Sequence, residues 1–489
     1  GNDSLSFVAA KTTQSGIVMA VAAQLAVYYN ERPMATNFVL KQDEGWVNTY
    51  IKAEIKKGET YRIEKLVSIC NSLSGGIDDP IAFVQHDAMS CKSFDEMLAG
   101  SAKVWEDIWR KVDVKVTGDR LAQKLLRLHI YHTLVTTSPH STGNDFGIPA
   151  RGLHGEEYRG HILWDELFIF PFFCLHYPEI AKSVLMYRYR RLSQARENAK
   201  GNGLKGAMFP WQSGSDGREE TLMDIFDPQS GEWSKDYSSL QRHVSLAIAY
   251  NVWNYFNITG DIDFMNDYGS ELFFDICRFW SSIAKLDPKT NRYSIEGVVG
   301  PDVYHQRIPG VTEAGVKDNA YTNIMVVWLF KRAFDLMEAM GENRRKMVLR
   351  SISLQEEELE LWRNQISRMN LSISPEGVLE QFEGFFSLKE IDWNTYREKL
   401  DKTNPLHSLL KSEGKATDVF KVCKQADALM IFFNILPAEV MQIIQDLGYT
   451  LPTDYLKNNF EYYYNRCAHS SSLAALTHAY VAALAGMNN

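Results

Sequence analysis

The 489-residue chain lacks the short motifs of several common functional classes. Its six cysteines are scattered, with no CxxC pair and no His/Cys cluster at metal-ligand spacing, so we expect no metal site and mostly buried thiols. The chain also has no glycine-rich nucleotide loop, and Ser470 beside His469 is too local to form a Ser-His-Asp triad. No cofactor is therefore implied.

Long apolar runs and an excess of basic residues are missing as well. The longest apolar stretch, residues 18–27 with one glutamine inside it, is too short to span a bilayer. The net charge of −9 and the pI of about 5.8 argue against a nucleic acid or an anionic membrane as partner, since either needs a basic face. The compartment is not indicated, and both cytoplasm and periplasm stay open.

Apolar and aromatic residues are abundant. Hydrophobic residues make up 45% of the chain and aromatic residues 12%, which is typical of a globular protein with a large core. From Ser6 to about Ile69, β-branched and aromatic residues alternate with polar ones, and turn residues such as Lys57-Gly58 interrupt the pattern. This period of two predicts antiparallel strands that form part of a β-sandwich.

Helical periodicity replaces this alternation after Pro80 and dominates to the C-terminus. Amphipathic helices separated by long loops favour a mainly α fold, an (α/α)6 barrel (toroid) with part of an N-terminal antiparallel β-sandwich. We expect a partial β-sandwich domain at 1–80, a helical linker at 81–117 and the barrel at 118–489. The predicted helices span residues 94–112, 118–137, 178–200, 239–258, 261–285, 320–341, 353–369, 424–434, 437–447, 453–464 and 471–486.

The most unusual stretch is residues 151–221, in which a helix separates two loops rich in Trp, Arg, His, Asp and Gly. A pyranose packs its C–H face on an aromatic ring and directs its hydroxyls to charged groups. Trp164, Asp165 and Trp211 are therefore suited to bind a sugar. The two loops are expected to form opposite walls of one pocket.

Ordered blocks between residues 151 and 472 match a known family. The first, Arg151-Gly-Leu…Tyr158-Arg-Gly-His161…Trp164-Asp165, closely resembles the signature of glycoside hydrolase family 65, which contains maltose, kojibiose and trehalose phosphorylases, inverting α-glucosidases and trehalases. Further blocks continue the match in order: Tyr187-Arg-Tyr-Arg190, Ala195-Arg-Glu-Asn-Ala199, Phe209-Pro-Trp211, Arg242-His243, Thr259-Gly-Asp261, Gly300-Pro-Asp302, Asp318-Asn-Ala-Tyr-Thr-Asn323, Lys424-Gln-Ala-Asp427 and His469-Ser-Ser-Ser472.

The resemblance implies an N-terminal β-sandwich, a linker region and an (α/α)6 catalytic barrel. Family members usually have a longer sandwich and a C-terminal β-domain, so a truncated or unusually short member is expected.

The family cleaves α-glucosidic bonds with inversion: a Glu protonates the leaving oxygen while phosphate, or water activated by a carboxylate, attacks the opposite face. The expected partner is an α-glucoside disaccharide or oligosaccharide, with inorganic phosphate as co-substrate in a phosphorylase. A homodimer stays open, because family members are often dimers.

The resemblance also assigns binding roles. The glucose before the cleaved bond is expected to contact seven side chains: Arg159, His161, Trp164, Asp165, Trp211, Lys424 and Gln425. His469, Ser471 and Ser472 align with the phosphate-binding segment of the phosphorylases, where hydroxyls and N–H groups at a helix start form an anion site. No Asp or Glu follows Glu461, so the general base of the hydrolases is missing from that segment. This favours a phosphorylase-like site.

One departure affects the proton donor. The family's Gly-Pro-Asp-Glu reads Gly300-Pro-Asp-Val303 here, so an isopropyl group stands where the acid is expected. Loss of general-acid assistance costs about 10²–10⁴-fold in rate. Two nearby carboxyls could act as substitutes: Asp302, which adjoins the lost position, and Glu313, in the loop at residues 306–316. The alternatives are a protein that binds α-glucosides without cleaving them, and a substitution introduced into the chain.

Every assigned residue also has a structural interpretation that stays open. Trp164 and Trp211 can be core residues, Arg159 can pair with Glu156 or Glu157, Lys424 and Gln425 can be exposed at a helix start, and Ser471 or Ser472 can be an ordinary N-cap. A toroid used only for assembly is a third, non-enzymatic possibility.

Overall fold

The computed structural model describes residues 4–91, 93–152, 157–227, 231–301, 304–400, 405–424, 427–469 and 472–487. The chain divides into two compact units, Gly1–Asp145 and Phe146–Asn489. The boundaries expected at residues 80 and 117 stay predictions. Among the predicted site residues, Asp302, Val303, Gln425 and Ser471 lie outside the described residues.

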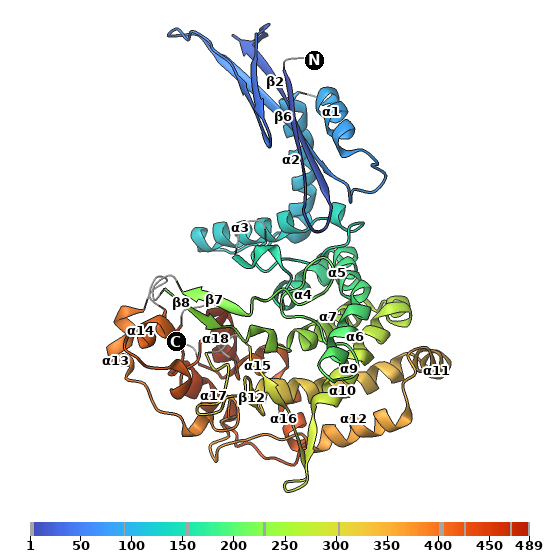
Figure 1. Cartoon of the computed structure of the whole chain (residues 1–489), viewed down its shortest axis with the longest axis vertical. Helices are drawn as coiled ribbons and strands as arrows, with labels where there is room; N and C mark the ends of the chain where they lie inside the picture. The colour runs from blue at the N-terminus through green and yellow to red at the C-terminus, as the bar shows by residue number, and fades with distance from the viewer. Residues whose placement is uncertain are drawn as a thin grey trace. The chain divides into compact units, whose positions relative to one another are not determined.

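The first unit is built on two long strands, β2 (Val18–Tyr29) and β6 (Tyr61–Asn71), which pair antiparallel along their whole length (Figure 1). Ala20 and Ala22 of β2 are fully buried on either side of the less buried Val21, which is the predicted period of two at this end of the strand. The other strands are β1 (Leu5–Lys11) and β3 (Arg32–Pro33), which pair with β2, and the hairpin of β4 (Val39–Asp43) and β5 (Trp46–Tyr50).

Three helices complete the first unit. They are α1 (Pro80–Ser90), α2 (Phe94–Val112) and α3 (Arg120–Thr136). Val84 and Ala88 of α1 pack against the buried face of β2 and β6. A capping box between Ser93 and Glu96 starts α2, because each residue satisfies a free backbone N–H of the other.

The second unit is mainly helical, with short strand pairs in its loops. Its helices are α4 (Glu166–His176), α5 (Pro178–Arg190), α6 (Leu192–Gly201), α7 (Val244–Thr259), α8 (Ile262–Phe264), α9 (Ser270–Ile283), α10 (Ala320–Ala339), α11 (Glu342–Ser351), α12 (Glu356–Arg368), α13 (Trp393–Tyr396), α14 (Leu406–Ser412), α15 (Met430–Asn434), α16 (Pro437–Asp446), α17 (Tyr455–Tyr464) and α18 (Ser472–Leu484). The strands are β7 (Asp224–Asp227), β8 (Glu232–Lys235), β9 (Lys285–Asp287), β10 (Arg292–Ser294), β11 (Glu296–Val298) and β12 (Val316–Lys317).

The helices of this unit form a closed ring. Helix α4 contacts α7, α7 contacts α10, α10 contacts α15, and α15 contacts α18. Phe433 of α15 closes the ring, since its ring centroid lies 5.7 Å from that of Phe168 of α4 and 5.5 Å from that of Tyr480 of α18. Every residue from Ala320 to Phe330 of α10 is buried, as expected for a helix with neighbours on all sides. The predicted (α/α)6 barrel is confirmed.

Several predicted helix boundaries are wrong. The single helix expected at 178–200 is two helices, because Arg191 leaves helical geometry to stack on Tyr187 at 3.7 Å and to donate to the carbonyl of Ser215 at 2.6 Å. The helix expected at 261–285 is interrupted by a π-turn at Met265–Gly269. The helix expected at 424–434 is helical only from Met430.

The expected buried thiols are confirmed. All six cysteines are unpaired, and all except the half-buried Cys91 are buried. Within the described ranges, each helix is too short or too polar to traverse a lipid bilayer.

Candidate functional site

A buried ion pair fixes the Trp164-Asp165 dipeptide at the start of α4. The guanidinium of Arg188 donates to Glu166 Oε2 at 2.8 Å and to the carbonyl oxygen of Leu163 at 2.8 Å. The other oxygen of Glu166 accepts from the backbone N–H of Ile148 at 3.1 Å. Because Leu163 and Glu166 flank the dipeptide, Arg188 holds both of its ends.

Four aromatic side chains from distant parts of the sequence meet beside this dipeptide. The ring of His243, at the start of α7, lies 4.7 Å from Trp164, 5.2 Å from Trp211 and 6.2 Å from Tyr321 of α10. Trp164 is 4% exposed and Trp211 7% exposed. The two predicted tryptophans therefore lie in one cluster and are core residues at the same time. We call these four residues the aromatic cluster.

His243 is the polar centre of the aromatic cluster. Burial lowers its pKa to about 3, although the nearby carbonyl of Val299 opposes this shift. Among the described residues, neither ring nitrogen has a partner at good hydrogen-bond geometry. A neutral imidazole with one N–H and one free lone pair can donate to one hydroxyl and accept from another. In the sequence, His243 belongs to a family motif, but no binding role was predicted for it.

The two Trp-containing loops are direct neighbours. An antiparallel bridge joins Ile162 to Ser213, and the ring of His161 lies 3.0 Å from Gln212 Oε1. The carboxylate of Glu219 accepts from the backbone N–H groups of Trp211 and Gln212. The loops thus form one continuous surface, which corrects the expectation that they face each other as opposite walls.

Arg159 lies at the edge of this surface. It is exposed, has a positive φ of 54°, and donates to the carbonyl oxygen of Glu220 at 3.4 Å. The alternative of an ion pair with Glu156 or Glu157 involves groups outside the described residues. Its role in sugar binding stays a prediction.

Asp427 is the most perturbed acid near these motifs. It is 1% exposed, and its Oδ2 accepts from Nδ2 of Asn319 at 3.0 Å. Burial raises the pKa of Asp427 to about 8, while hydrogen bonds from Asn319 and Gln381 act in the opposite direction. This carboxyl is therefore mostly protonated at neutral pH. The motif Lys424-Gln-Ala-Asp427 was recognised from the sequence, but Asp427 was not among the predicted site residues.

The backbone of Gly300 lies directly on this buried acid. A Cβ atom at Gly300 would stand 2.5 Å from Asp427 Oδ2 and 2.6 Å from Asn319 Nδ2. Glycine is thus required for close approach of the two segments. The segment that leads to Asp302 and Val303 therefore begins in contact with the side chain of Asp427. Both of those residues lie outside the described ranges.

Glu313, the other predicted substitute acid, is exposed in its loop. Its carboxylate accepts from the hydroxyl of Thr312 at 3.0 Å. Its proposed role as a proton donor remains a prediction.

The Lys424 motif and the His469 motif lie side by side. A parallel bridge pairs Cys423 with Cys467: the N–H of Cys423 donates to the carbonyl of Arg466, and the N–H of Ala468 donates to the carbonyl of Cys423, both at 2.9 Å. The expected sugar-binding and phosphate-binding segments are therefore neighbours, joined by this isolated bridge. The thiol of Cys467 donates to the carbonyl oxygen of Lys424, and these two residues are 43 positions apart in the sequence.

The neighbourhood of His469 contains a cation. Burial lowers the pKa of His469, and Arg397 lowers it further, so the imidazole is neutral at neutral pH. The guanidinium of Arg397 donates to the carbonyl oxygen of Asn465 at 3.2 Å, four residues before His469, and Ser472 begins α18 three residues after it. A cation beside a helix N-terminus favours an anion. Arg397 was not predicted from the sequence.

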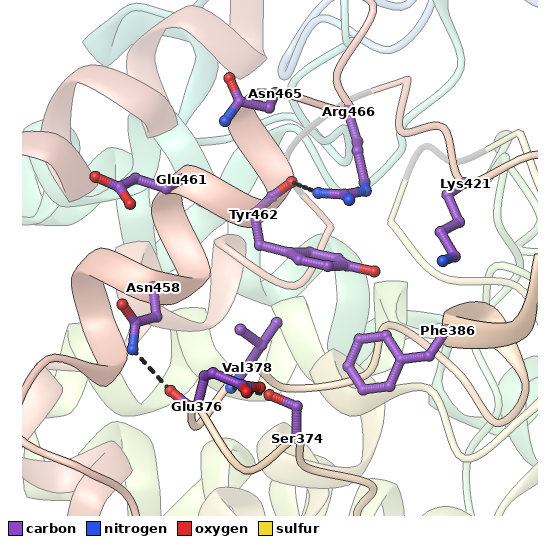
Figure 2. Close-up of a pocket in the computed structure, with 10 residues that line it drawn as sticks. All are labelled: Ser374, Glu376, Val378, Phe386, Lys421, Asn458, Glu461, Tyr462, Asn465 and Arg466. Carbon is purple, nitrogen blue, oxygen red and sulfur yellow. Dashed lines mark hydrogen bonds between the residues drawn. The ribbon is translucent and has the colours of Figure 1, made fainter. Parts of the chain in front are cut away.

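A separate cavity of about 540 Å³ opens between α17 and the loop around Val378 (Figure 2). Tyr462 lies edge-on to Phe386 at 5.6 Å, and the guanidinium of Arg466 stacks on the Tyr462 ring at 3.9 Å. Figure 2 also shows Asn458 donating to the carbonyl of Glu376. The lining includes none of the predicted sugar-binding residues that the structure describes.

Comparisons with known proteins agree with these motifs. Residues 127–489 match the model of the glycosyl hydrolase family 65 central catalytic domain, and residues 1–108 match that of the family 65 N-terminal domain. An uncharacterized glycosyl hydrolase of Mycobacterium tuberculosis is 36% identical over 98% of this chain and 36% of its own length. Trehalose 6-phosphate phosphorylase of Lactococcus lactis is 34% identical over 95% of this chain and 58% of its own length.

Two kojibiose phosphorylases extend the comparison. The enzyme of Halothermothrix orenii is 29% identical over 98% of this chain and 60% of its own length. The structure of a putative kojibiose phosphorylase from the human microbiome superposes with a TM-score of 0.76 at 22% identity, over 99% of this chain and 59% of that one. The chain thus spans between 36% and 60% of these relatives. With both family models matched and the barrel and motif residues in place, the chain belongs to glycosyl hydrolase family 65.

Proposed function

We propose that this chain cleaves the α-glucosidic bond of a disaccharide or a glucosyl end group with inversion, using inorganic phosphate as the nucleophile. The observation behind the proposal is the pairing of Cys423 with Cys467, which sets the sugar motif at Lys424 beside the phosphate motif at His469. Phosphate held next to the sugar can attack the anomeric carbon from the face opposite the leaving oxygen.

The aromatic cluster supplies the sugar subsite in this proposal. Trp164 and Trp211 offer apolar faces to the C–H side of glucose, and His243 offers a ring nitrogen to a hydroxyl. Asp165, Lys424 and Gln425 are assigned hydrogen bonds to the remaining hydroxyls. Arg159 and His161 are assigned to the rim of the same subsite.

The anion is assigned to His469, Ser471 and Ser472, with Arg397 as an added positive charge. The proton for the leaving oxygen is assigned to Asp302 or Glu313, because Val303 cannot donate one. The named phosphorylases among the relatives support phosphorolysis of an α-glucoside of the kojibiose or trehalose type. Hydrolysis is the second outcome of the same geometry, with water in place of phosphate.

Product analysis tests the proposal. The protein is incubated with kojibiose, maltose, nigerose, trehalose and trehalose 6-phosphate, each with and without phosphate, and the sugar products are identified with their anomeric configuration. We expect consumption that depends on phosphate and yields β-glucose 1-phosphate. Release of free β-glucose without phosphate would indicate hydrolysis, and no consumption of any of these sugars would reject catalysis on them.

The competing function is binding without cleavage, which Val303 specifically favours. Calorimetry with glucose and with each disaccharide measures the affinity of the subsite independently of turnover. Binding without turnover would support the non-catalytic alternative.

A further inference from the structure

We propose that Cys467, His469 and His478 form a binding site for one borderline-soft divalent metal ion of the zinc class. One ligand atom from each side chain lies within 4.8 Å of the other two, and these atoms are a thiol sulfur and two imidazole nitrogens. Sulfur and imidazole nitrogen are the ligands that Zn²⁺ prefers. We call these three residues the Cys-His-His cluster.

The state of His478 is the strongest reason for a ligand. This residue is 4% exposed, and neither of its ring nitrogens has a hydrogen-bond partner among the described residues. Its ring contacts are with Tyr464 at 5.2 Å, His469 at 5.5 Å and Phe460 at 6.1 Å, which use ring faces and edges only. A buried imidazole without partners loses its hydrogen bonds to water, and a metal bond would restore one interaction.

Cys467 has a suitable environment for a thiolate ligand. It is fully buried, the backbone N–H of His469 points to its sulfur at 3.4 Å, and its thiol donates to the carbonyl oxygen of Lys424 at 3.7 Å, a long bond that a metal-bound thiolate would give up. An N–H donor to sulfur stabilises a metal-bound thiolate. The neighbouring Cys423 is already engaged, since its thiol donates to Gln381 Oε1 at 3.2 Å. The cluster therefore supplies three ligands rather than four.

A tetrahedral ion held by three side chains has a fourth position for water or another ligand. Tetrahedral Zn²⁺ has Zn–S bonds of about 2.3 Å and Zn–N bonds of about 2.0–2.1 Å, which place its ligand atoms about 3.4–3.6 Å apart. The ligand atoms of the cluster lie at most 4.8 Å apart, so each pair must move closer by about 1.4 Å at most. His469 is exposed and can make this movement while the buried His478 and Cys467 stay in place. Its exposure also gives the ion a way in.

A functional consequence rests on the proposed phosphorolysis. His469 is assigned to phosphate in that proposal, so a metal ion on the same imidazole opposes phosphate binding. Zn²⁺ should then inhibit phosphorolysis in competition with phosphate.

Cobalt spectroscopy tests the metal site whether or not the chain is catalytic. Titration of the purified chain with Co²⁺ should give one equivalent of binding, with a thiolate-to-cobalt charge-transfer band and the intense visible bands of four-coordinate cobalt. Cys467→Ser should abolish the charge-transfer band, and His478→Gln should weaken Co²⁺ and Zn²⁺ binding by at least about tenfold. Cys91→Ser, at a half-buried cysteine of the other unit, should change neither.

His469→Ala keeps the test decisive if a buried variant fails to fold, because this side chain is exposed. It should also weaken Co²⁺ binding. A charge-transfer band that persists in Cys467→Ser, or affinity unchanged in His469→Ala, would overturn the site. The spectra report on the metal site even if the chain does not catalyse phosphorolysis. If the chain is active and binds the metal but is not inhibited by it, only the proposed competition between metal and phosphate is rejected.

Discussion

Arg188 and Glu166 form an ion pair at 2.8 Å whose side chains are 1% and 3% exposed. Removing one partner of such a pair leaves a buried charge and costs about 3–5 kcal/mol of unfolding free energy. We expect Arg188→Met to lose stability by that amount and to release the Trp164-Asp165 dipeptide. Chemical denaturation measures the first effect, and sugar affinity measures the second.

The control for this prediction is Arg363→Met. It removes two exposed pairs, with Glu356 and Glu360, and should cost less than about 1 kcal/mol for each pair. The double variant Arg188→Met/Glu166→Leu should be more stable than Arg188→Met alone, because no unpaired charge remains. Equal stability of Arg188→Met and the wild type would show that the pair does not hold this region.

Gly300→Ala tests the close approach of the Gly300 segment to the buried acid. The added Cβ would stand 2.5 Å from Asp427 Oδ2, so overpacking should cost about 1–3 kcal/mol and reduce any turnover. Gly201→Ala is the matched control, since no atom lies within 4 Å of its Cβ position. Thermal denaturation measures the melting temperatures of both variants. Equal melting temperatures would contradict the close packing of Gly300 against Asp427.

Asp427→Asn tests the protonation of the buried acid. The folded pKa of about 8 exceeds the unfolded value of about 3.9, so between these pH values the folded chain keeps a proton that the unfolded chain has released. Stability should therefore fall as the pH rises through this window, by up to about 1.4 kcal/mol per pH unit, and level off above it. Asp427→Asn should lose this part of the pH dependence.

Urea denaturation across the same pH range measures the difference between variant and wild type. Burial also raises the pKa of Asp318, but that residue contributes to both proteins and cancels in the comparison. Asp263→Asn, at an exposed carboxyl, should follow the wild-type profile. Identical profiles for Asp427→Asn and the wild type would mean that Asp427 is ionised in the folded chain.

Val303→Glu restores the acid of the family motif. If proton donation limits the rate, turnover should rise by about 10²–10⁴-fold, and Val303→Gln, which has the same shape without a proton to donate, should not show the gain. The measurement is initial rate on the disaccharide panel. An already active protein whose rate does not change would indicate that another acid, Asp302 or Glu313, protonates the leaving oxygen.

Trp211→Ala tests the aromatic cluster as a sugar subsite. Loss of one stacking face should weaken glucose binding by about 0.5–1.5 kcal/mol, which calorimetry resolves. Trp233→Ala, at a tryptophan that is 70% exposed and outside the cluster, is the control. Equal affinity of both variants would remove Trp211 from the subsite.

The sequence alone determined the local structure and the family. Alternation from Ser6 to about Ile69 predicted antiparallel strands, and β2 and β6 pair antiparallel in this part of the chain. Helical spacing predicted most helices, because the side chains that share a helix face are only three or four residues apart. The motif residues resembled the family signature without any knowledge of the structure, and the family models matched the same regions.

Only the tertiary structure decided which residues meet. Arg191 breaks a helix that its neighbours favour, since its guanidinium gains contacts with Tyr187 and with the distant Ser215. His243 meets Trp164, and Asp427 meets Asn319, only in the folded chain, because these partners are far apart in sequence. Spacing along a sequence sets the period of one helix or strand, but contacts between distant segments depend on how the packed ring closes.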